Sequence, residues 1–218
     1  MSLQPGVSMA ERKRQLVTTE LTEAALQLLA LKGFDGVTVD EIAARAGVSK
    51  RTFFRYFASK EDVVVRFLTD LGTGMCEELA ARPAGERPSL ALRHAVWAAM
   101  AECSDGLDGP DHAAKALRVV QLILRTPALL ARFLERQEQW RADLADRLAR
   151  RLGLDPATDL YPQLAAGMAL TAFNTALRRW SESDGAVDPA DLLDRAIAVM
   201  TPALDATGTP HPLDRDSG

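Results

Sequence analysis

The side chains best suited to chemistry lie in one short stretch, residues 38–60, with the sequence TVDEIAARAGVSKRTFFRYFASK. Its second half, Ser49–Lys60, contains no acid and four cationic residues, Lys50, Arg51, Arg55 and Lys60. A wholly basic segment in a chain of formal net charge -4 is a local feature, typical of surfaces that contact nucleic-acid phosphates. A solvated helix face has similar charges, and charge alone does not separate the two interpretations.

The order of residue types around Gly47 indicates a helix-turn-helix. Such a motif needs an inward apolar face on its first helix, a glycine in the tight turn, and an apolar residue that closes the joint. Ile42 and Ala43 supply the inward face. Gly47 supplies the turn, and Val48 follows it to close the joint.

The second helix of this motif is expected to face two ways. Phe53 and Phe57 stand four residues apart and anchor the helix inward. Phe54 then points outward beside Arg51 and Arg55, where a solvated ring gains little. In a DNA groove the same ring can meet thymine methyl groups, so Phe54 favours the DNA-binding interpretation.

Caps and glycines place the elements around this motif. Capping residues mark helix starts, and a glycine after an apolar-periodic segment marks a stop. The starts are Ser8 with Glu11, Thr38 with Glu41, Ser49, Ser59 with Asp62, Thr126-Pro127 and Asp188-Pro189; the stops are Gly33, Gly47 and Gly153. These signals predict helices over about residues 9–32, 39–45, 50–56, 60–81, 89–103, 111–125, 127–151, 161–183 and 189–204. In the first helix the expected buried stripe is Val17, Leu21, Ala24, Leu28 and Leu31.

The chain is therefore predicted to be all-α, with about nine helices in two domains. Residues 10–58 form an N-terminal helix-turn-helix domain of three helices, and residues 59–204 form a helical domain for ligand binding and dimerisation. Residues 1–9 and 205–218 are expected to be a disordered arm and a disordered tail.

The stretch resembles the DNA-binding domain of the TetR family, whose pattern is T-x-x-x-I-A-x-x-A-G-V-S-x-x-T-x-Y-x-Y-F-x-S-K. The matching residues are Thr38, Ile42, Ala43, Ala46, Gly47, Val48, Ser49, Thr52, Tyr56, Phe57, Ser59 and Lys60. Phe54 departs from the pattern, which has Tyr there, so a hydroxyl contact to phosphate is absent. The resemblance covers about residues 10–70, and it implies a sequence-specific transcription regulator of bacterial type.

The resemblance also implies roles for individual residues. The implied DNA-contacting set is Thr38, Ser49, Lys50, Arg51, Thr52, Phe54, Arg55, Tyr56 and Lys60. Its members divide between phosphates and base edges. Thr38, Tyr56 and Lys60 are assigned to phosphates, and Lys50, Arg51, Thr52 and Phe54 to bases, while Arg55 is left open between the two. The plainer alternatives are core packing for Tyr56 and helix stabilisation for Thr52.

Dimerisation is expected because a single motif makes few contacts, whereas two motifs ~34–36 Å apart can bind a palindrome. The last two helices are the candidate interface, since one is rich in small residues and the other has a broad apolar face. The assigned residues are Ala165, Gly167, Ala172, Ala176, Leu192, Leu193, Ala196, Ile197 and Met200. Packing within the core of one chain is the alternative.

A small-molecule effector is predicted because polar residues interrupt the apolar faces of the middle helices, as in ligand pockets. The assigned lining residues are His94, Trp97, Met100, Leu117, Gln121, Leu124, Phe133, Gln137, Trp140, Met168 and Asn174. Each of them could equally be a satisfied core or rim residue. The stretch 124–129, with Glu135-Arg136 and Trp140, is similar to a TetR subgroup with acyl-CoA-like ligands, which implies an apolar or acyl-CoA-like effector.

Other classes of function find little support in the sequence. No Gly-rich phosphate loop, G-x-S-x-G, C-x-x-C or Glu-x-x-His pair occurs, so neither an enzyme nor a metal or other cofactor is expected. Cys76 and Cys103 are expected to be reduced packing residues. No apolar stretch approaches the ~20 residues of a membrane span, and no signal peptide is evident, so a cytoplasmic protein without membrane contact is expected, nucleoid-associated when bound to DNA.

The resulting hypothesis is a homodimeric repressor of double-stranded operator DNA, released from a palindromic site by a small apolar or acyl-CoA-like ligand. The alternative is a helix-turn-helix protein without small-molecule input, whose C-terminal helices serve only dimerisation or a protein partner.

Overall fold

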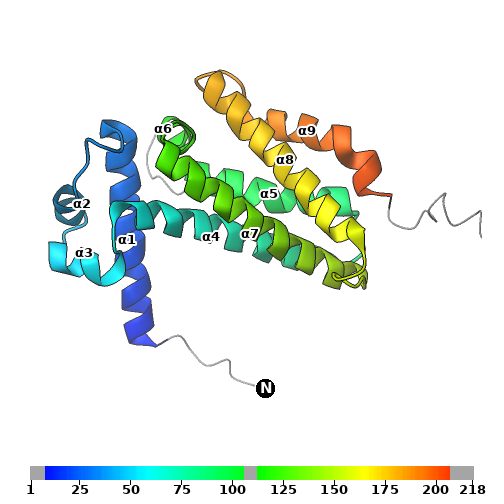
Figure 1. The fold of residues 1–218 in the computed structure, drawn as a ribbon, viewed down its shortest axis with the longest axis horizontal. Helices are drawn as coiled ribbons and strands as arrows, with labels where there is room; N and C mark the ends of the chain where they lie inside the picture. Colours follow the sequence, from blue (N-terminus) through cyan, green and yellow to red (C-terminus); the bar gives the residue numbers. More distant parts are fainter. Residues whose placement is uncertain (1–7, 106–111, 207–218) are drawn as a thin grey trace, which may run out of the picture. The chain divides into compact units, whose positions relative to one another are not determined.

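The computed structural model describes residues 8–105 and 112–206, and within them it contains nine α-helices and no strand (Figure 1). The helices are α1 Met9–Lys32, α2 Val39–Arg45, α3 Lys50–Tyr56, α4 Lys60–Ala81, α5 Pro88–Asp105, α6 His112–Arg125, α7 Pro127–Leu152, α8 Leu160–Glu182 and α9 Pro189–Leu204. The predicted all-α class is confirmed. The arm up to residue 7, the loop 106–111 and the tail from 207 lie outside the described residues, but Met9 is already helical.

The helices form two compact units, each of which is described by itself. The first unit holds the chain up to Asp70 and residues 103–134, and so includes α1–α3, the first half of α4, α6 and the start of α7. The second unit holds residues 71–102 and everything from Glu135 onward.

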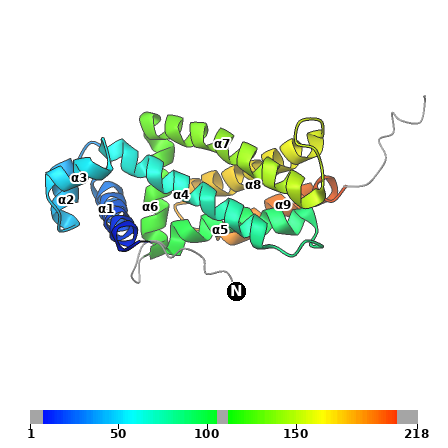
Figure 2. The ribbon, with the colours of Figure 1, turned by 90° about the horizontal axis from the view of Figure 1, so that it is seen from below.

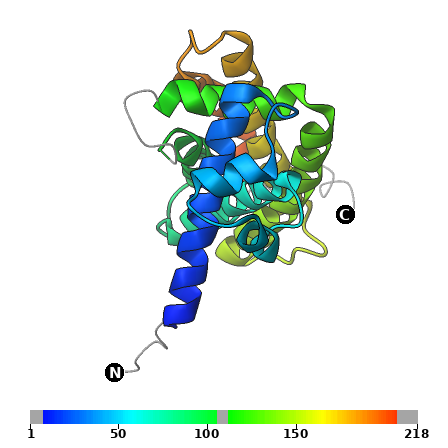
Figure 3. The ribbon, with the colours of Figure 1, turned by 90° about the vertical axis from the view of Figure 1, so that its left-hand side faces the viewer.

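In the first unit α1 is the common support. It contacts α2 and α6, and α2 in turn contacts α3 (Figures 2 and 3). The helix buries Leu21, Ala25 and Leu29 against these neighbours, whereas Leu31 is 67% exposed. The predicted stripe was therefore wrong at its end, because Leu29 and Leu31 differ by about 200° around a helix and cannot share one face.

The second unit is built around α8, which packs along α9. The C-terminal end of α9 is tied to the start of α5, since the backbone N–H and the hydroxyl of Ser89 each donate to Asp205 over 2.9 Å. Asp205 was predicted to open the disordered tail, and this pair of hydrogen bonds anchors it instead.

Five of the six predicted caps form as side-chain hydrogen bonds, whereas Thr126 makes only backbone hydrogen bonds at the start of α7 among the described contacts. Ser8 and Glu11 make a full capping box, as do Thr38 and Glu41. Asp188 accepts from the N–H of Ala190 over 2.9 Å, ahead of Pro189. Each start is local in sequence, which is why it could be predicted from spacing alone.

Candidate nucleic-acid interface

The turn between α2 and α3 is closed by backbone hydrogen bonds. Gly47 has φ of 66°, a left-handed conformation that a side chain disfavours. The N–H of Val48 then donates to the carbonyl of Ala43 over 2.9 Å, and Ser49 caps α3 by accepting from the N–H of Thr52. The predicted roles of Gly47 and Ser49 in the turn are confirmed, and together they determine where α3 begins.

Aromatic side chains hold α3 against its support. Phe53 is fully buried, and its ring centroid lies 5.6 Å from that of the buried Phe57. Phe54 contacts Phe53 edge-on at 5.5 Å but is 50% exposed. The predicted inward and outward directions of these three rings are therefore confirmed, and α3 presents an apolar ring to solvent among cations.

The cations of α3 are differently engaged. Lys50 forms an ion pair of 2.8 Å with Asp40 of α2, and both side chains are mostly exposed. Arg55 stacks over the ring of Tyr56 at 5.0 Å and donates to its hydroxyl. Arg51 is exposed and has no ion-pair or hydrogen-bond partner among the described residues. An exposed ion pair contributes only about 0–1 kcal/mol, so Lys50 can exchange Asp40 for another anion at little cost.

The N-terminus of α2 already has an acidic neighbour. The carboxylate of Glu41 accepts from the backbone N–H and the hydroxyl of Thr38, over 2.9 and 3.0 Å. A hydrogen bond from Lys32, followed by those from Thr38, lowers the pKa of Glu41 to about 2, so this carboxylate is charged at neutral pH. A phosphate at Thr38 therefore has to share the N-terminus of α2 with Glu41.

Lys60 has a structural role that the sequence pattern did not indicate. Its ammonium donates to the carbonyls of Phe34 and Val37, over 2.6 and 3.1 Å, and lies 4.3 Å from the centroid of the Phe34 ring. These bonds tie the segment between α1 and α2 to the start of α4. An ammonium has three donors, so one is left for a phosphate. The assignment of Lys60 to DNA stays a prediction.

The eleven predicted effector residues are divided between the two units. Leu117, Gln121, Leu124 and Phe133 belong to the first unit, and His94, Trp97, Met100, Gln137, Trp140, Met168 and Asn174 belong to the second. In the second unit Gln137 and Asn174 donate to each other reciprocally, over 2.5 and 2.9 Å. Their polar groups are satisfied without a ligand, as the plainer interpretation expects.

The other predicted effector residues of the second unit are wholly or partly buried. Trp140 packs edge-on against Phe173 at 6.4 Å, and Met100 is buried. His94, Trp97 and Met168 are half-buried. This burial suits a core and a pocket wall alike.

In the first unit, Gln121 lines a hollow of about 390 Å³ between the end of α1 and α6. Arg118 and Arg125 line it as well, and sequence reasoning missed both. Their spacing with Gln121 places all three on one side of α6, which is the signal that was available. Leu117 and Leu124 are half-buried, and Phe133 is buried.

The predicted dimerisation residues separate into two groups. Ala165, Ala172, Ala176, Leu193 and Ile197 are buried within the single chain, so they pack between its own helices and present no surface to a second copy. Gly167, Leu192, Ala196 and Met200 are partly exposed. The exposed apolar residues beside them, which sequence reasoning missed, are Leu164 on α8 and Val199 on α9, 62% and 82% exposed.

Helix α3 exposes its cations, is held by buried aromatic rings and follows a glycine turn. These features define a helix-turn-helix regulator of transcription. Residues 21–67 match the family model described as bacterial regulatory proteins of the tetR family, and residues 86–205 match the MftR C-terminal domain. The chain belongs to the TetR family.

Curated relatives extend over most of the chain. The transcriptional regulator TcmR of Streptomyces glaucescens is 34% identical over 176 residues, which are 80% of this chain and 77% of the relative. The transcriptional regulator MftR of Mycobacterium tuberculosis is 33% identical over 210 residues, covering 92% and 98%. Both relatives are named as regulators of transcription.

Solved structures share the fold. The fatty acid degradation regulator FadR of Bacillus halodurans aligns with a TM-score of 0.61 at 20% identity, over 84% of this chain and 94% of that one. FadR of Bacillus subtilis in complex with stearoyl-CoA aligns with a TM-score of 0.61 at 20% identity, over 84% and 96%. None of the described helices combines the length and apolar character needed to cross a bilayer.

Proposed function

We propose that this regulator is a homodimeric repressor, that α3 binds base edges of a palindromic operator, and that a small apolar or acyl-CoA-like effector releases it. The observation that carries the proposal is the outward face of α3, where Arg51 has no partner among the residues that the structure describes and Phe54 is half-exposed. A guanidinium suits the acceptors of guanine and an apolar ring suits a thymine methyl group. The regulator is assigned to the bacterial cytoplasm, on the nucleoid when bound.

Phosphate contacts complete the proposed interface. Lys60 offers its remaining donor, Tyr56 its hydroxyl, and Thr38 the first turn of α2. Arg55 lies on the ring of Tyr56 and is assigned to the same backbone contacts. These groups fix the register of α3, whereas Lys50, Arg51, Thr52 and Phe54 supply the base discrimination.

Fluorescence anisotropy across a salt series tests this proposal, with DNA from upstream of the regulator's own gene and scrambled DNA as the control. Specific binding is expected to be at least about 1,000-fold tighter than binding to the scrambled duplex, with two chains per site. If both duplexes bind equally and weakly, fragments selected from the whole genome are tested next. Absence of any preferred fragment contradicts a sequence-specific regulator.

The dimer is proposed to form through the exposed sides of α8 and α9. Leu164, Gly167 and Thr171 follow one another on the outward side of α8. A side chain added at Gly167 meets nothing closer than Cδ of Arg141 at 3.9 Å, so a second helix can approach there. On α9, Leu192 and Val199 lie seven residues apart and form an apolar strip with Ala196.

Replacing Leu164 or Val199 with Glu is expected to weaken dimerisation by at least about 10-fold, because each change places a charge in an apolar contact. The chain itself is expected to fold normally, since both side chains are exposed. Sedimentation equilibrium measures the effect, and Leu134→Glu, at an exposed leucine outside α8 and α9, is the matched control. An unchanged dimer in both variants contradicts this interface.

The proposed effector is a small apolar or acyl-CoA-like molecule. Its support is the buried apolar side chains of Met100 and Trp140 and the likeness in fold to a FadR that was solved with stearoyl-CoA. Effector and operator must weaken each other reciprocally if they favour different shapes of the dimer. The alternative, a regulator without small-molecule input, predicts that no acyl-CoA raises the melting temperature or releases the DNA.

A further inference from the structure

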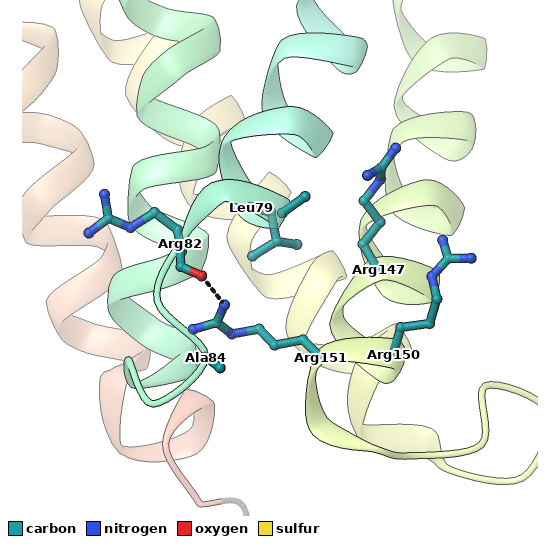
Figure 4. Close-up of a pocket in the computed structure, with 7 residues that line it drawn as sticks. Leu79, Arg82, Ala84, Arg147, Arg150 and Arg151 are labelled. Carbon is teal, nitrogen blue, oxygen red and sulfur yellow. Dashed lines mark hydrogen bonds between the residues drawn. The ribbon is translucent and has the colours of Figure 1, made fainter. Parts of the chain in front are cut away.

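A second hollow, of about 320 Å³, lies between the C-terminal ends of α4 and α7 in the second unit (Figure 4). Its lining combines apolar residues with arginines that come both from the end of α7 and from the connector after α4. The lining residues are Leu79, Ala80, Arg82, Ala84, Arg147, Arg150 and Arg151. Because four arginines line so small a volume, the question is which of their guanidinium groups are free to bind an anion.

Two of the arginines are committed to the protein. Arg151 donates to the carbonyls of Arg82, Pro83 and Glu86, which ties the connector after α4 to the end of α7. Arg82 donates to both oxygens of Glu86 over 2.7 and 2.8 Å, and its side chain points away from Arg147 and Arg150 (Figure 4). The hollow is therefore open while both guanidinium groups keep their hydrogen bonds to the protein.

Arg147 and Arg150 are the available pair. They stand three residues apart on α7 and extend to the same side of the helix (Figure 4). Arg147 hydrogen-bonds the thiol of the buried Cys76, and burial raises the pKa of that thiol, so the partner of Arg147 is a neutral and weak acceptor. Arg150 pairs with Asp146 one turn earlier in a mostly exposed contact, which an incoming anion can replace at about 0–1 kcal/mol.

The positive charge of Arg151 adds to this pair. Its Nε–H is buried and has no acceptor among the residues that the structure describes. A buried donor without an acceptor costs stability, and the nearby field of an anion offsets part of that cost. Within the described chain, no carboxylate lies within ion-pair distance of Arg147.

We propose that this hollow binds a phosphate-bearing small molecule, with Arg147 and Arg150 donating to its phosphoryl group. A phosphoryl group carries about two negative charges and three acceptor oxygens, which suits two guanidinium forks better than the two oxygens of a carboxylate. At about 30 Å³ per water, the volume leaves room for an organic body beside the phosphoryl group. Leu79, Ala80 and Ala84 line the hollow where that body would lie. The inference does not rest on DNA binding.

Isothermal calorimetry on the full chain tests the site with three probes: adenosine monophosphate, adenosine and inorganic phosphate. Acetate keeps the ionic strength constant. Adenosine monophosphate is expected to bind and adenosine is not, because the phosphoryl group supplies the contacts to arginine. Inorganic phosphate is expected to bind more weakly, since it lacks the body. If phosphate alone binds, and Arg147→Ala and Arg150→Ala both weaken it, the site is supported with a body other than adenosine.

Arg147→Ala and Arg150→Ala are each expected to weaken binding by at least about 10-fold. Arg179→Ala removes the same charge from an exposed position on α8 and is expected to leave binding unchanged. Arg147→Lys retains the positive charge but loses the paired donors of the guanidinium, so its affinity is expected to lie between those of wild type and Arg147→Ala. This variant controls for loss of folding at position 147. Three results overturn the proposal. They are equal binding of adenosine and adenosine monophosphate, wild-type affinity in both alanine variants, and no binding of any phosphate up to about 10 mM.

Discussion

Arg51→Ala is expected to weaken operator binding by about 1–3 kcal/mol, roughly 10- to 150-fold, and to relax base preference at one position of each half-site. The effect is large because Arg51 is exposed on α3 and has no competing partner among the described residues. Its guanidinium is therefore available to the acceptors of a guanine. The measurement is anisotropy on the operator and on duplexes substituted one base pair at a time.

Two controls make this result specific. Arg87→Ala removes the same charge from an exposed side chain just before α5, where a pair of 3.8 Å with Asp205 is lost, and it is expected to leave operator binding nearly unchanged. Lys50→Ala is expected to have a smaller effect than Arg51→Ala, because Lys50 must first leave Asp40. A loss of equal size on the operator and on scrambled DNA would show that Arg51 contacts phosphate, contrary to the prediction.

Gly72→Ala is expected to destabilise the chain by about 1–2 kcal/mol, although alanine is the better helix former. A Cβ at position 72 of α4 would lie 2.1 Å from Nε1 and 2.2 Å from Cδ1 of the Trp140 indole. That ring is buried and packs on Phe173, so it has little freedom to withdraw. Overpacking of about 2–3 kcal/mol therefore outweighs a gain in helix propensity of about 1 kcal/mol.

Gly85→Ala is the matched control for this experiment. No atom lies within 4 Å of a Cβ at Gly85, and its φ is not left-handed. The substitution is expected to be neutral or to stabilise the chain by up to about 1 kcal/mol, because it restricts the unfolded chain. Urea unfolding at one protein concentration compares the two variants. Equal stability of Gly72→Ala and wild type would mean that the indole moves freely.

Local rules explain why much of the DNA-binding part was predictable. The caps at Ser8, Thr38 and Ser49 need partners three residues away, and the turn at Gly47 needs a single backbone conformation. Neither depends on a distant segment. The same rules gave Gly33 as the stop after α1, and α1 does end there, although its ψ of 168° lies outside the left-handed helical region that a glycine stop usually adopts.

Such local rules do not predict contacts between side chains from segments that are distant in sequence. Lys60 carries the charge of a phosphate contact, but its bonds to Phe34 and Val37 depend on how α4 meets the segment before α2. Gln137 and Asn174 were assigned to a ligand, and each is satisfied by the other across 37 residues of sequence. That a side chain is polar can be inferred from its residue type, whereas its hydrogen-bond partner depends on which atoms the fold brings within about 3 Å.

The amino-acid sequence by itself determined the helical class, the helix boundaries and the outward face of α3, because these follow from spacing, caps and one glycine turn. Tertiary structure alone decided which apolar residues of α8 and α9 are left exposed, since burial depends on which helix covers a face and not on hydrophobicity. It also decided that Gly72 admits the Trp140 indole and that Arg147 and Arg150 line one hollow with residues of α4. Close approach between segments far apart in sequence has no local signal, so only packing can reveal it.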